Sequence, residues 1–408
     1  MRFPALQSKD FLIYTAGSFA SVNAIWINRV IVGWLGWELT GLASWVGLLS
    51  FFLFAPTIVS SPLFGVLLDR VDLRRAAIIS QSVMIATVAS LLVLFLTGLL
   101  TIWMLGLVAL AVGFSASADR TIRFVLVPRV VEKVALANAV AIHGINFNTA
   151  RLIGPAVGGL LIDVAGTETA IIVNLVLVLP YLAVMFFVKL RERDTPKRKR
   201  QSFLAEIVDG ARYAMKHPII REAMILSGLF SITIRGIIEI LPAIADGVFH
   251  RGAQGLGQML AVSGAGALIA AVVIALRRSG PSDARISIGV YFSVIGGIVG
   301  AIGLGLTANW YTALAMVFVV GFCLTINGID LQASIQVALS DDYRGRVMSL
   351  WIVLVIGGAA ISAIVLGFLA DLVGMSATLV GAGIVCLVIV GASTIKVMKG
   401  RIAAPPGA

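Results

Sequence analysis

Long apolar runs alternate with short polar breaks along the whole chain. A helix that crosses a membrane needs roughly 20 mostly apolar residues, and twelve runs meet that length. They cover residues 11–37, 43–67, 76–98, 102–124, 138–164, 168–189, 221–244, 256–276, 286–306, 310–337, 348–372 and 375–396. The breaks at 97–101, 165–168 and 306–309 leave room only for tight hairpins. The pattern predicts an all-α membrane protein with twelve transmembrane helices.

The longest polar break, residues 190–218, divides the twelve runs into two sets of six. Within it, Phe203, Ile207, Ala211 and Met215 recur at a spacing of four. This spacing predicts an amphipathic helix along the membrane surface that ends near Pro218. We therefore expect a first bundle at 1–190, a linker at 191–218 and a second bundle at 219–408.

An internal repeat supports two related halves. The sequence G-x-L-x-D-x-x-G occurs at Gly159–Gly166 and again at Gly367–Gly374, an offset of about half the chain. Arg29 and Arg235 also lie in the first run of each set. Two halves in parallel orientation are one repeat pattern of membrane transporters.

Composition agrees with a membrane protein and excludes several other classes. Hydrophobic residues make up 59% of the chain, charged residues only 12%, and the mean hydropathy is +1.03. The net charge of +11 lies in loops, so it indicates anionic lipid near Lys197–Arg200 rather than nucleic acid. Cys323 and Cys386 lie in apolar runs and form no metal-binding pattern. We expect no cofactor or metal, no enzymatic activity and, without a phosphate-binding loop, no ATP-driven transport.

The basic residues predict the orientation. Five lie inside apolar runs, one falls in a break after an odd-numbered run, and the others lie at the termini or after even-numbered runs. The five are Arg29, Arg120, Arg123, Arg151 and Arg235, and the exception is Arg251. Because cytoplasmic loops carry the excess of Lys and Arg, both termini should be cytoplasmic. The first run is too long for a cleaved signal peptide, so we expect it to be the first span.

Two motifs resemble the major facilitator superfamily. After the second run, the stretch from Gly65 to Arg75 is similar to its loop motif G-x-L-x-D-R-x-G-R-R, with Asp72 and Leu73 as departures. The matching positions are Gly65, Asp69, Arg70, Arg74 and Arg75. The resemblance implies a network that holds the cytoplasmic side shut.

In the fifth run, Gly154-Pro155-Ala-Val-Gly158-Gly159 resembles the G-P-x-x-G-G motif of antiporting members of the superfamily. A packing kink without directional meaning is the alternative, because proline bends a helix. Further strings, at 34–41, 128–139 and 343–349, resemble the enterobactin-exporter-like branch, the transmembrane secretion effectors. That branch implies proton-linked export of siderophores, drugs or related metabolites.

Ionisable and polar residues inside the spans are the candidate site, because such groups are costly in lipid. Candidates for the substrate cavity are Asn23, Arg29, Arg120, Arg123, Arg151, Arg235, Asn327, Asp330, Gln332 and Gln336. Candidates for the coupling proton are Glu239, Asp119 and Asp330.

Each charged candidate has an alternative role. Arg29 either meets the substrate or bridges to an acid. Arg235 and Glu239, four residues apart, either pair with each other or leave Glu239 to carry the proton. Asp119 either pairs with Arg70 or Arg74 of the loop motif or carries the proton.

The sequence thus predicts a monomeric secondary transporter of the bacterial inner membrane. Its expected partners are a small organic substrate, protons and membrane lipid. Proton-coupled export by alternating access is the main hypothesis. A lipid or lysolipid flippase on the same fold and a non-transporting sensor or assembly protein are the alternatives.

Overall fold

A computed structural model describes residues 4–68, 71–191, 203–276, 286–340 and 343–402, and these residues contain helices and no strand. The first half consists of five long helices and two short 3-10 turns. They are η1 (Pro4–Gln7), α1 (Lys9–Thr40), α2 (Ala43–Leu68), α3 (Leu73–Leu96), α4 (Ile102–Val130), η2 (Lys133–Ala135) and α5 (Leu136–Phe187). Helix α5 contains two spans, because the chain folds back at Gly166, whose φ is 83°. Glycine adopts positive φ without the penalty that a side chain would add.

The second half begins with α6 (Phe203–Lys216) and continues with a broken span and five further helices. They are α7 (Pro218–Thr233), η3 (Arg235–Ile238), η4 (Ala243–Val248), α8 (Gly252–Leu276), α9 (Ile288–Leu306), α10 (Trp310–Ala338), α11 (Arg344–Val373) and α12 (Met375–Ile402). Seven helices of the described part are long and apolar enough to cross a membrane by composition alone. With α5 folded back and the shorter apolar helices included, the order is consistent with the predicted twelve spans.

The seventh span is where the sequence prediction was wrong. A continuous helix was expected over 221–244, but α7 ends at Thr233 and a 3-10 turn and a π-helical segment follow. Gly236 lies directly against α11, and its amide donates a hydrogen bond to the Ser362 hydroxyl at 3.2 Å. Pro242 lacks an amide hydrogen, so it cannot close a helical turn. The break places Arg235 in the 3-10 turn and Glu239 directly after it, outside the α-helix.

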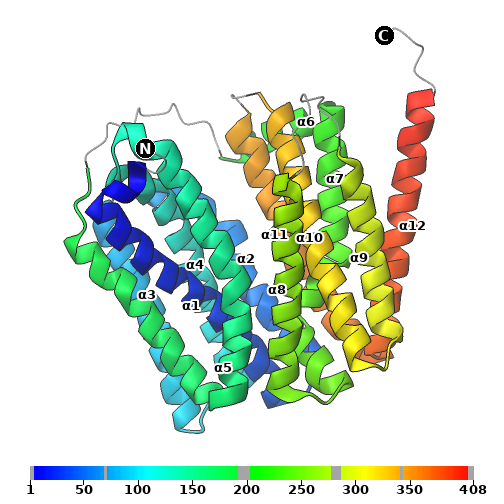
Figure 1. The fold of residues 1–408 in the computed structure, drawn as a ribbon, viewed down its shortest axis with the longest axis horizontal. Helices are drawn as coiled ribbons and strands as arrows, with labels where there is room; N and C mark the ends of the chain where they lie inside the picture. The colour runs from blue at the N-terminus through cyan, green and yellow to red at the C-terminus, as the bar shows by residue number, and fades with distance from the viewer. Residues whose placement is uncertain (1–3, 69–70, 192–202, 277–285, 341–342, 403–408) are drawn as a thin grey trace.

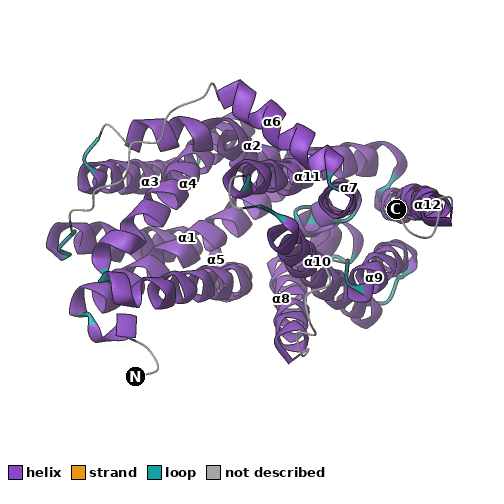
Figure 2. Ribbon diagram, turned by 90° about the horizontal axis from the view of Figure 1, so that it is seen from above, coloured by secondary structure: helices purple, strands orange, loops and turns teal. Residues whose placement is uncertain are grey.

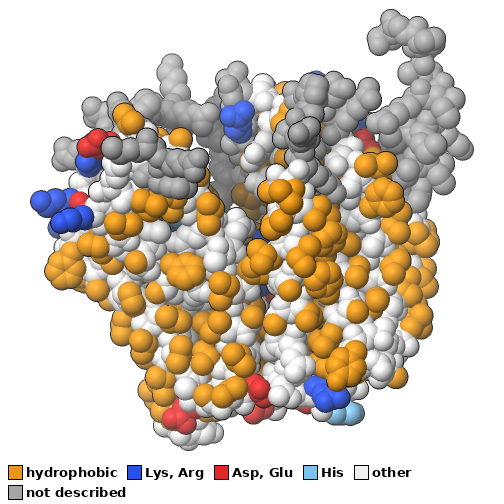
Figure 3. All heavy atoms as spheres, in the orientation of Figure 1, with side chains coloured by type: hydrophobic (Ala, Val, Ile, Leu, Met, Phe, Trp, Pro, Cys, Tyr) orange, Lys and Arg blue, Asp and Glu red, His pale blue; other side chains and the backbone are white. Residues whose placement is uncertain are grey.

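Both ends of the chain lie at one end of the molecule. Figure 1 shows α1 beginning and α12 ending at the side that also carries α6. We call this side the terminal end. The opposite side, the hairpin end, carries the turns at Gly41, Gly98, Gly166 and Gly374, all with positive φ. Apolar side chains cover the belt between the two ends, and charged ones gather near the ends (Figure 3), as expected for a protein surrounded by lipid.

Helix α6 lies across the terminal end and packs on α11 (Figure 2). Arg346 of α11 donates to Asp209 at 2.5 Å, and the rings of Tyr213 and Tyr343 stack with centroids 4.1 Å apart. Ala214 is buried, whereas Met215, predicted for the apolar face, is exposed. The helix is confirmed, but its buried face is set by α11.

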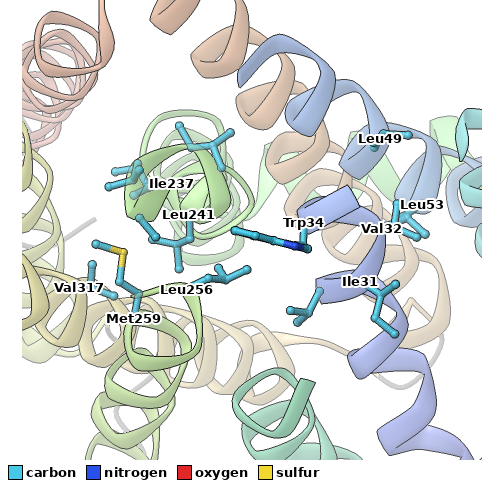
Figure 4. Packing of buried hydrophobic residues seen from close by; sticks show 14 of the residues in the cluster. Ile31, Val32, Trp34, Leu49, Leu53, Ile237, Leu241, Leu256, Met259 and Val317 are labelled. Carbon is cyan, nitrogen blue, oxygen red and sulfur yellow. The ribbon is translucent and has the colours of Figure 1, made fainter. Parts of the chain in front are cut away.

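The two halves meet at the hairpin end. The main contacts between them join α2 with α11 and α5 with α8. One buried apolar cluster extends across both halves, and in it Trp34 of α1 points toward Leu241 and Leu256 of the second half (Figure 4). Asp371, at the end of α11, accepts hydrogen bonds from the amides of Ala43 and Ser44 at 2.9 Å each.

Toward the terminal end, the described residues form two separate apolar clusters. One contains only residues of the first half, among them Phe11, Leu126 and Tyr181. The other contains only residues of the second half, among them Ile220 and Trp351. The described structure is therefore closed at the hairpin end, with each half packed on its own at the terminal end.

Candidate substrate and coupling site

An ion pair joins the two halves in the molecular interior. Arg29 lies in the middle of α1, and its guanidinium donates to both carboxylate oxygens of Glu239 at 2.8 Å. The Ser50 hydroxyl of α2 lies 3.4 Å from the same carboxylate. The side chains of Arg29 and Glu239 are 17% and 15% exposed, so the pair keeps some access to solvent. Both bonds come from one nitrogen, Nη2, and they are charge-assisted hydrogen bonds.

This pair shows which partners Arg29 and Glu239 have, which the sequence left open. Arg29 does bridge to an acid, and that acid comes from the other half of the chain. The predicted pairing of Arg235 with Glu239 is wrong, because Glu239 bonds to Arg29 instead. The α-helix ends at Thr233 and the two residues are joined by a 3-10 turn, whereas the spacing rule for i and i+4 residues applies to an α-helix.

Three further arginines surround the pair without an acid of their own. In the part of the chain that the structure describes, Arg120, Arg151 and Arg235 have no hydrogen-bond or ion-pair partner. The charge of Arg29 acts on Arg120 and Arg151, the charge of Asp119 also acts on Arg120, and the charges of Arg151 and Glu239 act on Arg235. All four arginines are only partly buried. Their charges act on one another, so the four arginines lie in one region around the contact between Arg29 and Glu239.

Aromatic rings connect these arginines on the side of the first half. The Cζ atom of Arg29 lies 4.6 Å from the Trp26 ring centroid and 4.3 Å from that of Phe54. The Trp26 ring meets the Phe147 ring edge to face at 6.1 Å. Arg120 in turn lies 5.6 Å from the Phe147 ring. Such contacts stabilise a cation through the negative face of the ring.

These rings were not among the residues predicted from the sequence, although a signal was present. Trp26 lies three residues before Arg29, and Phe147 lies four residues before Arg151. Residues at these spacings share a helix face. An aromatic residue one helical turn from an arginine inside a span therefore indicates an aromatic ring at the same site.

A second ion pair is enclosed within the first half. Asp119 and Arg123 of α4 are joined at 2.5 Å, and both side chains are 3% exposed. Gln81 donates to Asp119 at 2.7 Å, and Arg123 donates to the hydroxyls of Ser18 at 2.5 Å and Ser21 at 3.0 Å.

The packing of this pair corrects two expectations. Asp119 pairs with Arg123 and not with Arg74, which donates instead to the carbonyls of Phe186 and Val188. Arg70, the other predicted partner, lies outside the described residues. Arg123 stacks on Tyr181 at 3.6 Å and is buried within the first bundle, so Arg120 is the arginine of α4 that remains partly exposed.

The other predicted polar residues fall into two groups. Asn23 is buried between α1 and α5, where it donates to the Phe19 carbonyl at 2.8 Å. In α10, Asn327 is buried, Asp330 and Gln332 are partly exposed, and Gln336 is exposed. A cavity role for these four residues of α10 stays a prediction.

The antiporter-like motif lies in α5 and faces two neighbouring helices, α1 and α8. Gly154 and Gly158 face α1, where a Cβ on Gly154 would lie 2.6 Å from the Cβ of Trp26. Gly159 faces α8, where a Cβ would lie 2.5 Å from the Cα of Gly257. Pro155 is partly exposed. The glycines let α5 approach both neighbours closely, one of them in the other half.

The loop motif is described in part. Gly65 lies in α2, whereas Asp69 and Arg70 lie outside the described residues. Asp72, one of the two departures from the family pattern, caps α3 by accepting the Arg75 amide at 2.9 Å. A side-chain cap of this kind satisfies an amide that the helix cannot.

Two six-helix bundles closed against each other at one end, with charged side chains between them, define a transporter of the major facilitator type. The chain belongs to the transmembrane secretion effector family, whose model matches residues 2–403. The predicted superfamily and branch are confirmed, and family and fold are those of transporters rather than enzymes.

Similar proteins agree with this assignment. The enterobactin exporter EntS of Escherichia coli is 27% identical over 295 residues, which cover 71% of this chain and 68% of EntS. EntS of Escherichia fergusonii matches to the same extent. The crystal structure of the nucleoside transporter NupG has a TM-score of 0.72 at 13% identity and covers 94% of this chain and 98% of its own. A bacterial homologue of the human lysosomal transporter Spinster, described as inward-facing and unoccupied, has a TM-score of 0.70 at 12% identity, with 93% and 95% coverage.

Proposed function

We propose that this protein is a proton-coupled exporter of a small organic molecule across the bacterial inner membrane, with both termini in the cytoplasm. The observation that carries the proposal is the ion pair between Arg29 and Glu239, which links the two halves. Its partial exposure gives protons and solutes access to it. The similarity to the enterobactin exporter supports outward transport of an organic solute.

The pair suggests how exchange is enforced. Protonation of Glu239 removes its negative charge, so the attraction to Arg29 is lost. A negatively charged solute that binds among the neighbouring arginines competes with the same carboxylate for Arg29. Either ligand thus releases the link between the halves, whereas the empty, deprotonated site keeps it. Solute and proton then cross in alternate steps of the cycle, which is exchange of one for the other.

Among the candidate acids, Glu239 fits the coupling role best. Asp119 is held by Arg123 and Gln81 inside one bundle, so its protonation would break packing within a half rather than between halves. Asp330 remains a second candidate because it is partly exposed on α10. Glu239 is bonded to a charged group of the opposite half, Arg29.

Transport in liposomes tests the proposal. The test solutes are those that accumulate less in cells that overproduce the protein. They are added to liposomes that contain purified protein and the trapped pH indicator pyranine. The wild type should show proton movement that depends on the solute. Glu239→Gln should lose this proton movement while still exchanging solute for solute, because the amide cannot carry a proton at neutral pH.

The matched control is Glu168→Gln, an exposed acid at the hairpin end, which should behave as the wild type. Full solute-dependent proton movement in Glu239→Gln would exclude this residue as the proton site. Absence of such movement in the wild type with every solute it exchanges would exclude proton coupling altogether.

A further inference from the structure

The region around Glu239 contains more positive charge than its own acid can balance. Arg29 is bonded to Glu239, the charge of Glu239 also acts on Arg235, and no acid among the described residues acts on Arg151. The acid whose charge acts on Arg120 is Asp119, which is already paired with Arg123. Charged groups inside a membrane protein are costly unless a partner or a water-filled cavity compensates them. Repulsion among the arginines adds to that cost. A negatively charged ligand would supply the compensation that the described residues do not.

Two buried donors at the same place are also unpartnered. The Nε1 atom of Trp26 and the Nε atom of Arg29 are buried and have no hydrogen-bond acceptor. Buried polar atoms are bonded in the great majority of cases. These orphaned donors belong to residues already in contact with each other, at 4.6 Å from guanidinium carbon to ring centroid.

The rings define the shape of the missing partner. Trp26, Phe54 and Phe147 present flat apolar surface beside the guanidinium groups of Arg29 and Arg120. An aromatic ligand would pack on such rings with offset or edge-to-face geometry. Its acidic groups would accept paired hydrogen bonds from the planar guanidinium groups.

We propose that the transported solute is an organic dianion or polyanion on an aromatic frame, bound by Arg120, Arg151 and Arg235 beside the rings of Trp26 and Phe147. Carboxylate, phosphate and sulfonate are the acidic groups that this arrangement accommodates. A dianion offsets two of the three positive charges that remain while Arg29 is paired with Glu239, and a trianion offsets all three. The inference rests on the proposed transport function and names its substrate class.

Binding to purified protein in nanodiscs of zwitterionic lipid tests this class without any proton gradient. Isophthalate, its monoamide and its uncharged diamide have nearly the same size and differ in charge. Titration calorimetry should show isophthalate binding at millimolar concentration or below, the monoamide about tenfold more weakly, and the diamide not at all. Naphthalene disulfonate serves as a larger dianionic probe.

Substitutions locate the site. Arg151→Gln and Arg235→Gln should each weaken isophthalate binding about tenfold, and Arg151→Lys should recover part of it. The control is Arg251→Gln, an exposed residue at the hairpin end that stacks on Trp310 at 5.6 Å, and it should bind as the wild type. Elution of each variant as a monodisperse peak separates lost binding from lost folding.

Several results would overturn the proposal. Equal binding of the diamide and the dianion would show that charge is not recognised, and so would folded arginine variants that bind as tightly as the wild type. Failure of both dianionic probes to bind at millimolar concentration would count against it as well.

The headgroup of an anionic lipid carries the same acidic groups as the proposed solute. A comparison of two lipid compositions distinguishes a bound lipid from a soluble substrate. Loss of isophthalate binding in nanodiscs of anionic lipid, with binding kept in zwitterionic ones, would assign the site to lipid and overturn a soluble substrate. Dianion binding without proton coupling would reject only the proton-coupled function. Proton-coupled transport without dianion binding would reject only the substrate class.

Discussion

At the scale of single residues, two ion pairs inside the membrane region differ in what surrounds them. Asp119 and Arg123 are enclosed by serine, glutamine and tyrosine side chains of one half. Arg29 and Glu239 come from different halves and stay partly exposed. The first pair has the surroundings of a structural element, and the second can exchange its partner during transport.

Asp119→Asn should therefore destabilise the protein without changing its coupling. Removing one partner of a buried pair leaves an uncompensated charge, which costs about 3–5 kcal/mol. Thermal unfolding in detergent should show this loss, while proton movement per folded molecule stays at the wild-type level.

The control is Glu132→Gln, whose partner Arg191 lies 3.0 Å away with both side chains largely exposed. An exposed pair contributes about 0–1 kcal/mol, so this variant should unfold near the wild-type temperature. Equal stability of the two variants would contradict a structural role for Asp119.

Sequence reasoning identified the charged residues but not all their partners. The pair of Asp119 and Arg123 follows the helical spacing of four and was predictable from it. The pair of Arg29 and Glu239 spans 210 residues of chain, and no local pattern connects them. Only the packing of one half against the other brings them together.

At the scale of helices, the sequence predicted the spans well because lipid imposes a minimum apolar length on each. It did not predict the break after Thr233, because that break depends on the contact of Gly236 with α11. Nor did it predict which face of α6 is buried, since stacking on Tyr343 and bonding to Arg346 determine that face.

The close approach of α5 and α8 should control the closed hairpin end. Gly257 has no room for a side chain, because a Cβ would lie 3.1 Å from the backbone of Gly159. Gly257→Val should push the two halves apart there. A thiol introduced by Leu241→Cys, in the buried cluster between the halves, should then react faster with a membrane-impermeant reagent.

Gly381→Val is the matched control, because a Cβ at Gly381 in α12 meets no atom within 4 Å. It should leave the reactivity of the Leu241→Cys thiol unchanged. The protein without Leu241→Cys gives the background from the two buried native thiols, Cys323 and Cys386. Unchanged reactivity in Gly257→Val would mean that this contact does not keep the halves together.

At the scale of the whole molecule, the two halves repeat a sequence motif but use it differently. Asp371 accepts two amides at the start of α2 and so ties α11 to the other half. Asp163, at the repeated position, is exposed and bonds to no other described residue. The closed hairpin end is thus held asymmetrically by one of the two aspartates.

Asp371→Asn should shift the molecule toward opening at the hairpin end. Asparagine keeps one acceptor oxygen, so one of the two amides loses its acceptor. Loss of one hydrogen bond costs about 1 kcal/mol, which corresponds to roughly a fivefold change in the equilibrium. Spin labels replacing the exposed residues Leu99 and Leu372, one in each half, should report a larger population of long distances.

Asp163→Asn provides the control for this measurement and should leave the distance distribution unchanged. A larger shift in Asp163→Asn than in Asp371→Asn would refute the asymmetry.

The four interior arginines have one more consequence, which concerns the electric field across the membrane. With one glutamate beside them they leave an excess of three positive charges between the halves. A charge that crosses the whole field changes its energy by about 2.3 kcal/mol per 100 mV. In each conformation the membrane voltage drops mainly across the closed side of the transporter. The electrical energy of these charges therefore differs between the two conformations, even though the charges barely move. The resting voltage of the cell would then set which side the empty transporter opens to, and a bound dianion would offset most of that bias.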